Sequence, residues 1–367
     1  MRFFNTAGPV DAELHYQIPP LTRLNLNNLM QLIQQRKYFI LHAPRQTGKT
    51  SALVALRDRL NESGEYRCVY VNVELDQSDQ EDVETAMRTI LSSIALAADN
   101  ESLDRAWLEA LTTTGPHFAL QKTLALWSES EPKPIVLMID NIDALVGDTL
   151  LAVLRQLRAG YTNRPNHFPQ SVILCGVRDV CDVRDYHIDS TAGAAIVPDG
   201  VFNVSAKSLR LTDFSPSEVE SLLAQHTEAT GQGFAEEAYQ NIWNLTQGQP
   251  WLVNALAHEA CFKSKAGQDH SKPILSQAIQ DARQQLILRR ETHLDQLADN
   301  LCEERVQRVI QPLLTGTITT DPITNDDLQY VRDLGLVTEQ GSIAIANPIY
   351  RDLIFQVLSP HSEALTA

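Results

Sequence analysis

The sequence is poor in cysteine, and its cysteines have no regular spacing. The five residues are Cys68, Cys175, Cys181, Cys261 and Cys302, and no two of them form a Cys-x-x-Cys pair. This pattern indicates neither a disulfide framework nor a zinc site. Cys68 and Cys175 lie in apolar runs typical of buried strands, so we expect them to be core residues.

Long apolar runs are also missing. No stretch reaches the length of about 20 apolar residues that spans a bilayer. The first residues, Met1-Arg2-Phe3-Phe4-Asn5, contain no apolar region of a signal peptide. We therefore expect a soluble, cytoplasmic protein without a membrane partner.

Basic residues are in the minority. The chain carries 30 Lys and Arg against 46 Asp and Glu, which gives a formal net charge of −16. This balance disfavours nonspecific binding of the whole protein to nucleic acid or to anionic membranes, although it allows a local basic patch. With 367 residues, 43% of them hydrophobic, the chain has room for two or three domains.

The most informative segment that is present is Ala43-Pro44-Arg45-Gln46-Thr47-Gly48-Lys49-Thr50. It follows the apolar run 38–41 and leads into a helical pattern that starts at Ser51. Strand, turn and helix, with Gly-Lys-Thr at the start of the helix, are the layout of a phosphate-binding P-loop. The usual pattern begins with Gly, and Ala43 takes that position here. The alternative is an ordinary strand–helix turn that happens to carry a lysine.

The P-loop interpretation gives these residues distinct roles. Backbone N–H groups of residues 43–51 point at the phosphates. Gly48 lets the backbone come close to the anion, since a side chain there would block it. Lys49 reaches the β- and γ-phosphates, and the Thr50 hydroxyl ligates Mg²⁺. The sequence contains no Asn-Lys-x-Asp motif for guanine, so we expect ATP, ADP and Mg²⁺ as the ligands.

A second motif, Ile139-Asp140-Asn141-Ile142-Asp143, ends the apolar run 134–140. A carboxylate at the tip of such a strand is the Walker B arrangement, and we expect Asp140 to hold Mg²⁺ beside Thr50. The alternative is a strand that ends in a turn-favouring Asp. Many P-loop ATPases have Glu at the next position, whereas the Asn141 amide can hold a water but cannot accept its proton. Asp143 is the substitute base or, alternatively, the N-cap of the next helix.

A third candidate, Arg178, follows the apolar run 171–177. In P-loop ATPases with an extra strand between the P-loop strand and the Walker B strand, this tip points at the γ-phosphate. We expect Arg178 to sense or stabilise that charge. The alternative is a loop arginine that pairs with Asp179, Asp182 or Asp185.

The remaining pattern predicts the domain organisation. Short apolar strands alternate with helical patterns up to about residue 212, which favours a parallel α/β sheet buried on both faces. The strands are expected at 38–41, 68–73, 134–140, 171–177 and 208–211, and the helices at 80–98, 116–128 and 147–159. We expect a P-loop ATPase domain over 1–212, a helical lid over 213–290 and a winged-helix-like domain over 291–367.

The lid is predicted from helical patterns alone. They cover 215–230, 234–246, 250–264 and 273–290, and the first opens on the capping box Ser215-Pro216-Ser217-Glu218. Gly248-Gln249-Pro250-Trp251 lies at a helix junction. The lid can bring this corner, and Pro250 with it, onto the nucleotide. The alternative is a plain corner with Trp251 in the core.

The C-terminal pattern is typical of a winged helix. A helix over 324–334 is followed by short strands at 336–338 and 343–346 around a turn. The helix that would read DNA carries Asp326, Asp327 and Asp333 against Arg332. Acidic groups that face phosphates repel them, so this composition disfavours a nucleic-acid partner.

These motifs together resemble bacterial AAA-like P-loop ATPases of the archaeal-type and signal-transducing (STAND) branch. The resemblance rests on residues 38–50, on Leu245-Thr246-Gln247-Gly248-Gln249-Pro250-Trp251-Leu252-Val253-Asn254, and on Asp333-Leu334-Gly335-Leu336 with Ile345-Ala346-Asn347-Pro348-Ile349-Tyr350. It implies an α/β P-loop NTPase fold of the ASCE type, with sheet order 5-1-4-3-2, followed by a helical lid and a winged helix. Members of this group have Glu where this chain has Asn141, which bears directly on hydrolysis.

The function we expect is an ATP-binding ATPase with slow turnover that acts as a nucleotide-controlled switch. A protein partner, or a second copy of the chain, would bind through the lid and the winged helix. Two alternatives stay open at this point. One is a scaffold that binds nucleotide and hardly hydrolyses it, because of Asn141, and the other is a DNA-associated ATPase that uses the winged helix.

Overall fold

The computed structural model describes residues 2–74, 82–178, 205–315, 323–339 and 341–358. They form two compact units. One, which we call the α/β unit, comprises residues 24–42 and 49–211, and the other, which we call the helical unit, comprises the residues up to 23, residues 43–48 and those from 212 onward. In the described parts of the chain, no helix is long and apolar enough to cross a membrane.

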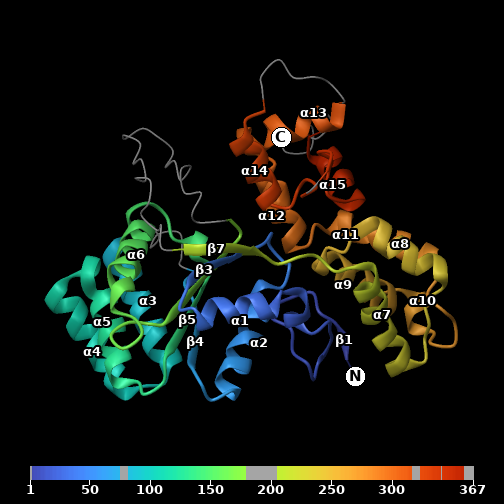
Figure 1. Ribbon diagram of the computed structural model, residues 1–367. Helices are drawn as coiled ribbons and strands as arrows, with labels where there is room; N and C mark the ends of the chain where they lie inside the picture. The colour runs from blue at the N-terminus through green and yellow to red at the C-terminus, as the bar shows by residue number, and fades with distance from the viewer. Residues whose placement is uncertain (1, 75–81, 179–204, 316–322, 340, 359–367) are drawn as a thin grey trace. The chain divides into compact units, whose positions relative to one another are not determined.

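A five-stranded parallel sheet is the centre of the α/β unit (Figure 1). The strand order is β4-β5-β6-β3-β7. The strands are β3 (Tyr38–His42), β4 (Arg67–Asn72), β5 (Ile135–Asp140), β6 (Ser171–Gly176) and β7 (Ser205–Arg210). β6 therefore lies between β3, the strand before the P-loop segment, and β5, the strand that ends in Asp140.

Helices cover both faces of this sheet. Figure 1 shows α1 and α2 on one side and α3, α5 and α6 on the other. The helices are α1 (Leu26–Gln34), α2 (Lys49–Glu62), α3 (Val83–Ala98), α4 (Glu101–Thr114), α5 (Pro116–Ser130) and α6 (Gly147–Gly160). Every residue of β3, β5 and β6 is buried, as a parallel sheet covered on both faces requires.

The core follows the two-residue period of the strands. Alternate residues such as Ile40, Leu137 and Leu174 share one core with the buried Trp127 of α5. Their neighbours along the strands are buried as well, on the opposite face. The parallel α/β architecture expected from the sequence is thus confirmed.

The helical unit contains most of the remaining helices. They are α7 (Pro216–Thr230), α8 (Glu236–Thr246), α9 (Pro250–His258), α10 (Lys265–Gln268), α11 (Ser276–Arg289), α12 (Thr292–Asn300), α13 (Glu304–Thr315), α14 (Asn325–Asp333) and α15 (Pro348–Leu358). α7 starts with the expected capping box, in which Ser215 and Glu218 bond each other's backbone N–H groups. The helix expected over 250–264 is shorter, because α9 ends at His258 and a π-helical turn, η5 (Glu259–Lys263), follows.

The N-terminal residues also pack in the helical unit. A parallel pair of two-residue strands, β1 (Phe3–Phe4) and β2 (His15–Tyr16), places Phe4 and Tyr16 in the core of the helices. Ile18 lies in the same core. The expected boundary had put these residues in the P-loop domain. Division of the chain into three domains stays a prediction.

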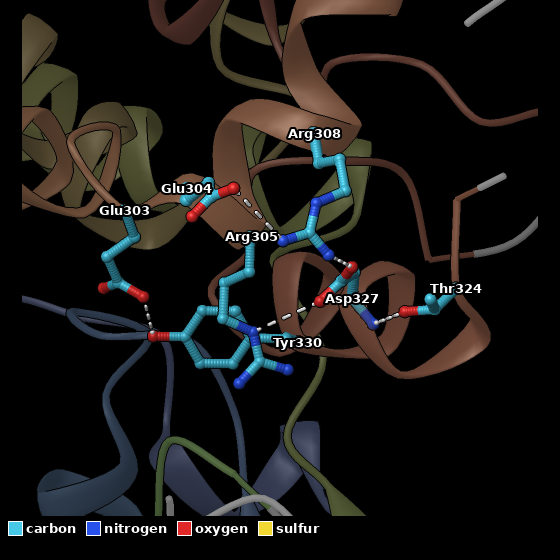
Figure 2. Close-up of polar contacts among 7 residues, drawn as sticks. All are labelled: Glu303, Glu304, Arg305, Arg308, Thr324, Asp327 and Tyr330. Atoms are coloured by element: carbon cyan, nitrogen blue, oxygen red, sulfur yellow. Dashed lines mark hydrogen bonds and ion pairs between the residues drawn. The ribbon is translucent and has the colours of Figure 1, made fainter. Parts of the chain in front are cut away.

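After α12, the helices α13 and α14 are joined through the buried carboxylate of Asp327 (Figure 2). Asp327 accepts a hydrogen bond from Arg308 Nη1 at 2.7 Å, and Arg305 Nε lies 3.5 Å from its other oxygen. Thr324 caps α14 by accepting the Asp327 N–H at 3.0 Å. The Arg305 guanidinium also lies over the ring of Tyr330. After α14, Val337 and Ile345 form an antiparallel bridge, at the place where the hairpin was expected.

Candidate phosphate-binding site

The P-loop segment joins β3 directly to α2. Gly48 has φ +89°, a left-handed conformation that favours glycine. Gln46 is also left-handed, with φ 61°. The Thr47 hydroxyl donates a 2.7 Å hydrogen bond to the Pro44 carbonyl, which closes the turn internally. Ala43 is fully buried, so the position where the usual pattern has Gly accepts a methyl group.

The first residues of α2 contact the end of β5. Lys49 and Ser51 are buried at the start of the helix. The Thr50 hydroxyl donates a 2.7 Å hydrogen bond to Oδ2 of Asp140, which is 90 residues away in the sequence. The two motifs on which the P-loop interpretation depends are therefore in direct contact.

Asp140 is a fully buried carboxylate that accepts further hydrogen bonds. The Tyr70 hydroxyl donates to Oδ2 at 3.0 Å, and the Asn141 N–H donates to Oδ1 at 3.0 Å. Burial and the negative charge of Asp140 raise the pKa of Tyr70, so its hydroxyl stays protonated and keeps donating. Tyr70 was not expected from the sequence, because a tyrosine in a strand is common and its cross-strand partner cannot be read from spacing.

Asn141 has a left-handed backbone, with φ 56° and ψ 39°. Asparagine tolerates this conformation better than most residues. Its side-chain amide donates a 3.0 Å hydrogen bond to Oδ1 of Asn72. Asn72 lies opposite Asp140 in the register of β4 and β5, so two amides meet at the carboxyl end of these strands. Asn72 was also missed by the sequence.

Asp143 lies in a short 3₁₀ helix, η2 (Ile142–Ala144), and contacts the end of β6. Its Oδ1 accepts the Val177 N–H at 3.3 Å. A Cβ added at Gly176 would lie 2.5 Å from the same oxygen, so the carboxylate is packed closely against this strand. The alternative role as N-cap of the next helix is wrong, because the N-cap of α6 is Val146.

Two more candidate residues, Cys175 and Arg178, lie in or just after β6. Cys175 is fully buried, as expected for a core residue. Burial and the charge of Asp140 raise the pKa of its thiol well above the ordinary value, so it stays protonated. Arg178 is half-buried, two residues after the end of β6. Its alternative partners, Asp179, Asp182 and Asp185, lie outside the described residues.

Within the helical unit, the corner before α9 reaches the P-loop segment. Gln249 caps α9 by accepting the Leu252 N–H at 2.6 Å, and its Nε2 lies 3.4 Å from the Gln46 carbonyl. Pro250 is the buried first residue of α9. Trp251 is in the core and donates to the Thr6 carbonyl at 2.9 Å. The buried Trp251 agrees with a plain corner. A contact of Pro250 with the nucleotide stays a prediction.

The turn after α14 approaches the same segment. Gly335 has φ +76°, and an added Cβ would lie 2.7 Å from Cγ of Pro44. Only a glycine allows so close an approach in this conformation. Residues 43–48 are therefore contacted by two separate parts of the helical unit.

The acidic residues of α14 do not all face outward. Asp326 is exposed, whereas Asp327 and Asp333 are buried, and Asp327 is paired with two arginines. The expected repulsion of phosphates by three exposed acids is thus wrong for two of them. The sequence gives the number of acidic residues, but it does not show which of them are buried and paired inside the fold.

Comparison with known proteins bears on the whole chain. The family model described as "AAA-like domain" matches residues 20–355. No curated protein gives a significant match. Among solved structures, the Aeropyrum pernix ORC1 protein in complex with DNA is similar, with 13% identity, coverage of 93% of each chain and a TM-score of 0.49.

Two other solved structures show a similar level of likeness. The Aeropyrum pernix ORC2 protein (ADPNP-ADP complexes) has 13% identity, covers 96% of this chain and 95% of its own, and has a TM-score of 0.48. The Thermotoga maritima RuvB Holliday junction branch migration motor has 11% identity, covers 90% and 95%, and has a TM-score of 0.45. Identity at this level is too low to carry function from one protein to another. The family model, in contrast, spans nearly the whole chain, and the protein therefore belongs to the AAA-like domain family.

Proposed function

We propose that this protein is an ATP-binding P-loop ATPase with slow turnover, which acts as a nucleotide-controlled switch. The observation that carries the proposal is the 2.7 Å hydrogen bond between Thr50 and Asp140. A threonine at the start of a P-loop helix and a carboxylate at a strand tip are the two protein groups that hold a magnesium–nucleotide complex. Lys49 would bind the β- and γ-phosphates, and backbone N–H groups of 43–51 would surround them.

The residues fit a magnesium ion. A hydroxyl and a carboxylate are the hard oxygen ligands that Mg²⁺ prefers, and it keeps several waters besides one or two protein ligands. Bound there, Mg²⁺ would neutralise charge on the phosphates. Tyr70 would keep the Asp140 carboxylate oriented toward Thr50.

Slow turnover follows from the residues that surround the strand ends. The Asn141 amide can orient a water but cannot take its proton. Asp143 can accept a proton, but its Oδ1 already accepts the Val177 N–H. We assign Asp143 as the base, acting directly or through a second water, and Arg178 as the group that senses the γ-phosphate.

The switch role is supported by contacts inside the helical unit. Gln249 and Gly335 both approach residues 43–48, from the corner before α9 and from the turn after α14. A phosphate that reorders this segment would change both contacts, and so bias the helices that carry them. We propose that residues 213–290 act as a lid and 291–367 as a winged helix, and that a protein partner or a second copy of the chain binds these parts.

Nucleotide titration tests this function. We expect the purified protein to bind MgADP and MgATP, and we expect Lys49→Ala to bind both at least about tenfold more weakly, because a charge-assisted contact to phosphate is lost. Equal affinity of the two proteins would contradict the P-loop interpretation. An absence of binding by the parent protein would contradict the function as a whole.

Two other functions have one observation each in their favour. The hydrogen bond between Asn141 and Asn72 favours a scaffold that binds ATP or ADP and hardly hydrolyses it. Burial of Asp327 and Asp333 leaves Asp326 as the exposed acid of α14, which favours a DNA-associated ATPase more than the sequence did. DNA binding that weakens as salt rises would support the latter, and undetectable affinity at low salt would contradict it.

A further inference from the structure

Arg23 joins the backbone of the P-loop segment to the start of the helices within the helical unit. It is the last residue of a short 3₁₀ helix, η1 (Pro20–Arg23). Its Nη1 donates a 2.6 Å hydrogen bond to the Thr47 carbonyl, while Nε, at 3.0 Å, and Nη2 both donate to the Thr212 carbonyl. The guanidinium also lies 4.8 Å from the ring centre of Phe214. One side chain therefore bonds two backbone segments that are far apart in the sequence.

The guanidinium remains charged in this position. Burial lowers the pKa of Arg23 to about 10, and the negative charges of Asp213 and Glu218 oppose the shift. At neutral pH it is protonated, so its hydrogen bonds to the two carbonyls are charge-assisted and stronger than those of a neutral donor. The planar fork of an arginine also fixes direction, which a lysine does not.

The hydrogen bond from Arg23 to the Thr47 carbonyl fixes the orientation of one peptide group in the loop. The peptide between Thr47 and Gly48 is trans, so its C=O and N–H point in opposite directions. Arg23 holds the carbonyl, and the Gly48 N–H therefore points away from the guanidinium. In a P-loop, N–H groups at this place bind the α- and β-phosphates.

Gly48 is also packed against Arg23. A Cβ added at Gly48 would lie 3.2 Å from Nη1 of Arg23. The missing side chain thus admits the guanidinium, in addition to the nucleotide. The sequence motif explains Gly48 by the nucleotide alone.

We propose that Arg23 is a positioning residue for phosphate binding, which holds the Thr47–Gly48 peptide with its N–H ready for the anion and links this orientation to Thr212, directly before the lid. The proposal rests on the proposed nucleotide-binding function. Arg23 acts through a backbone N–H, whose partners are phosphates that ADP and ATP share. Loss of Arg23 should therefore lower the affinity for ADP and for ATP by the same factor. An arginine that acted by its charge alone would favour ATP, which carries more negative charge.

The test compares variants of the full chain. Arg23→Gln removes the charge and the planar set of guanidinium donors. Arg23→Lys keeps the charge, but all its donors are on one nitrogen. Arg88→Gln is the matched control, because Arg88 is an exposed arginine of α3 whose ion pair with Glu84 is 3.7 Å long. The dissociation constants of MgADP and MgATP are measured for each variant, together with the unfolding midpoint without nucleotide.

We expect Arg23→Gln and Arg23→Lys to bind both nucleotides about tenfold more weakly, with an unchanged ratio of ADP to ATP affinity and an unchanged value for Arg88→Gln. Full rescue by Arg23→Lys, a selective loss of ATP affinity, or wild-type affinity in Arg23→Gln would each overturn the proposal.

A second measurement does not need nucleotide. Hydrogen exchange is followed in peptides that cover 43–50 and 211–216, where the Phe214 N–H is bonded to the Gly248 carbonyl at 2.9 Å in the native fold. We expect faster exchange of the Phe214 amide in Arg23→Gln and Arg23→Lys than in Arg88→Gln. Exchange equal to the control would overturn the proposed link. Hydrogen exchange does not depend on nucleotide binding. A parent protein that binds no nucleotide would therefore contradict the proposed function, while the exchange data would still test the link that Arg23 makes to Thr212.

Discussion

The Thr50 hydroxyl and the Asp140 carboxylate are joined by a 2.7 Å hydrogen bond across the carboxyl ends of the sheet. In the sheet, β6 lies between β3, which precedes the P-loop segment, and β5, which ends in Asp140. Asp140 is fully buried, so its charge needs such donors. This relationship is the structural basis of the magnesium site that we propose.

Replacement of Thr50 tests that site. Thr50→Val has almost the same shape but removes the hydroxyl, so we expect the magnesium dependence of nucleotide binding to be lost, while Thr50→Ser retains it. Titration of ATP in two conditions, one with Mg²⁺ and one with a chelator in its place, measures the effect. A Thr50→Val protein that still binds MgATP more tightly than free ATP, by the parent's factor, would contradict the assignment.

Replacement of Asn141 separates slow hydrolysis from none. Asn141→Glu supplies a base, but it loses the hydrogen bond to Asn72 and places a side chain that lacks asparagine's tolerance at φ 56°, at a cost of about 1 kcal/mol. We expect kcat to rise by no more than about tenfold, since Asp143 already serves the parent. Asn141→Ala, which lacks both groups, is the control for lost packing. A much larger rise from a nearly inert parent would favour the scaffold.

Acid should destabilise the helical unit through His293. Burial, with a smaller effect of the positive charge of Arg45, lowers the pKa of His293 from its ordinary value of 6.5 to about 4. Between these values the unfolded chain binds a proton that the folded chain does not, so stability falls as the pH falls from 6.5 to 4. The loss attributable to this group is about 3 kcal/mol by pH 4. Its buried Nδ1 has no hydrogen-bond partner among the described residues, so a proton there would be unpaired.

Urea unfolding at pH 7 and pH 5 measures this effect. His293→Gln removes the titrating group near the Tyr350 hydroxyl, which lies 2.8 Å from Nε2 of His293. We expect its stability to depend less on pH than that of the parent. His117→Gln, at an exposed position of α5, is the control and should keep the parent's profile. A steep acid loss that is the same in His293→Gln and in the parent would show that other groups cause it.

The buried carboxylate of α14 should matter for stability. Asp327→Ala leaves Arg305 and Arg308 without their shared partner, and we expect a loss of about 1–3 kcal/mol in the free energy of unfolding, because the two arginines are partly exposed and Arg308 keeps its ion pair with Glu304. Asp326→Ala, one position earlier on the same helix and exposed, should change it by less than about 0.5 kcal/mol. Chemical denaturation of the two variants measures the difference, and similar values would contradict the pairing seen in Figure 2.

The sequence predicted the parts of the fold that have a strong local pattern. The strands β3, β5 and β6 are continuous apolar runs, and each lies within two residues of its expected range. The capping box at Ser215 was also predictable, because it satisfies backbone groups locally. Helix α4 was missed, although much of it is exposed in the way expected of a surface helix.

The partners of the candidate residues could not be predicted. Tyr70 and Asn72 reach the Asp140 region through the register of β4 on β5, and register between distant strands is not encoded in spacing. Arg23 acts on the P-loop backbone, which has the same atoms at every position and so leaves no trace in the sequence. The packing of Phe4 and Tyr16 with the C-terminal helices is likewise a long-range contact. Motifs thus indicated which residues we expect to carry the chemistry, whereas the groups that position these residues could not be read from the sequence.

Hydrolysis of MgATP by the purified protein, with Lys49→Ala as the blank, tests the central claim most directly. Our account predicts a slow turnover that is clearly above the blank and that falls in Asp143→Asn. Turnover equal to the blank, in a protein that nevertheless binds MgATP, would contradict the ATPase claim and leave a nucleotide-locked scaffold.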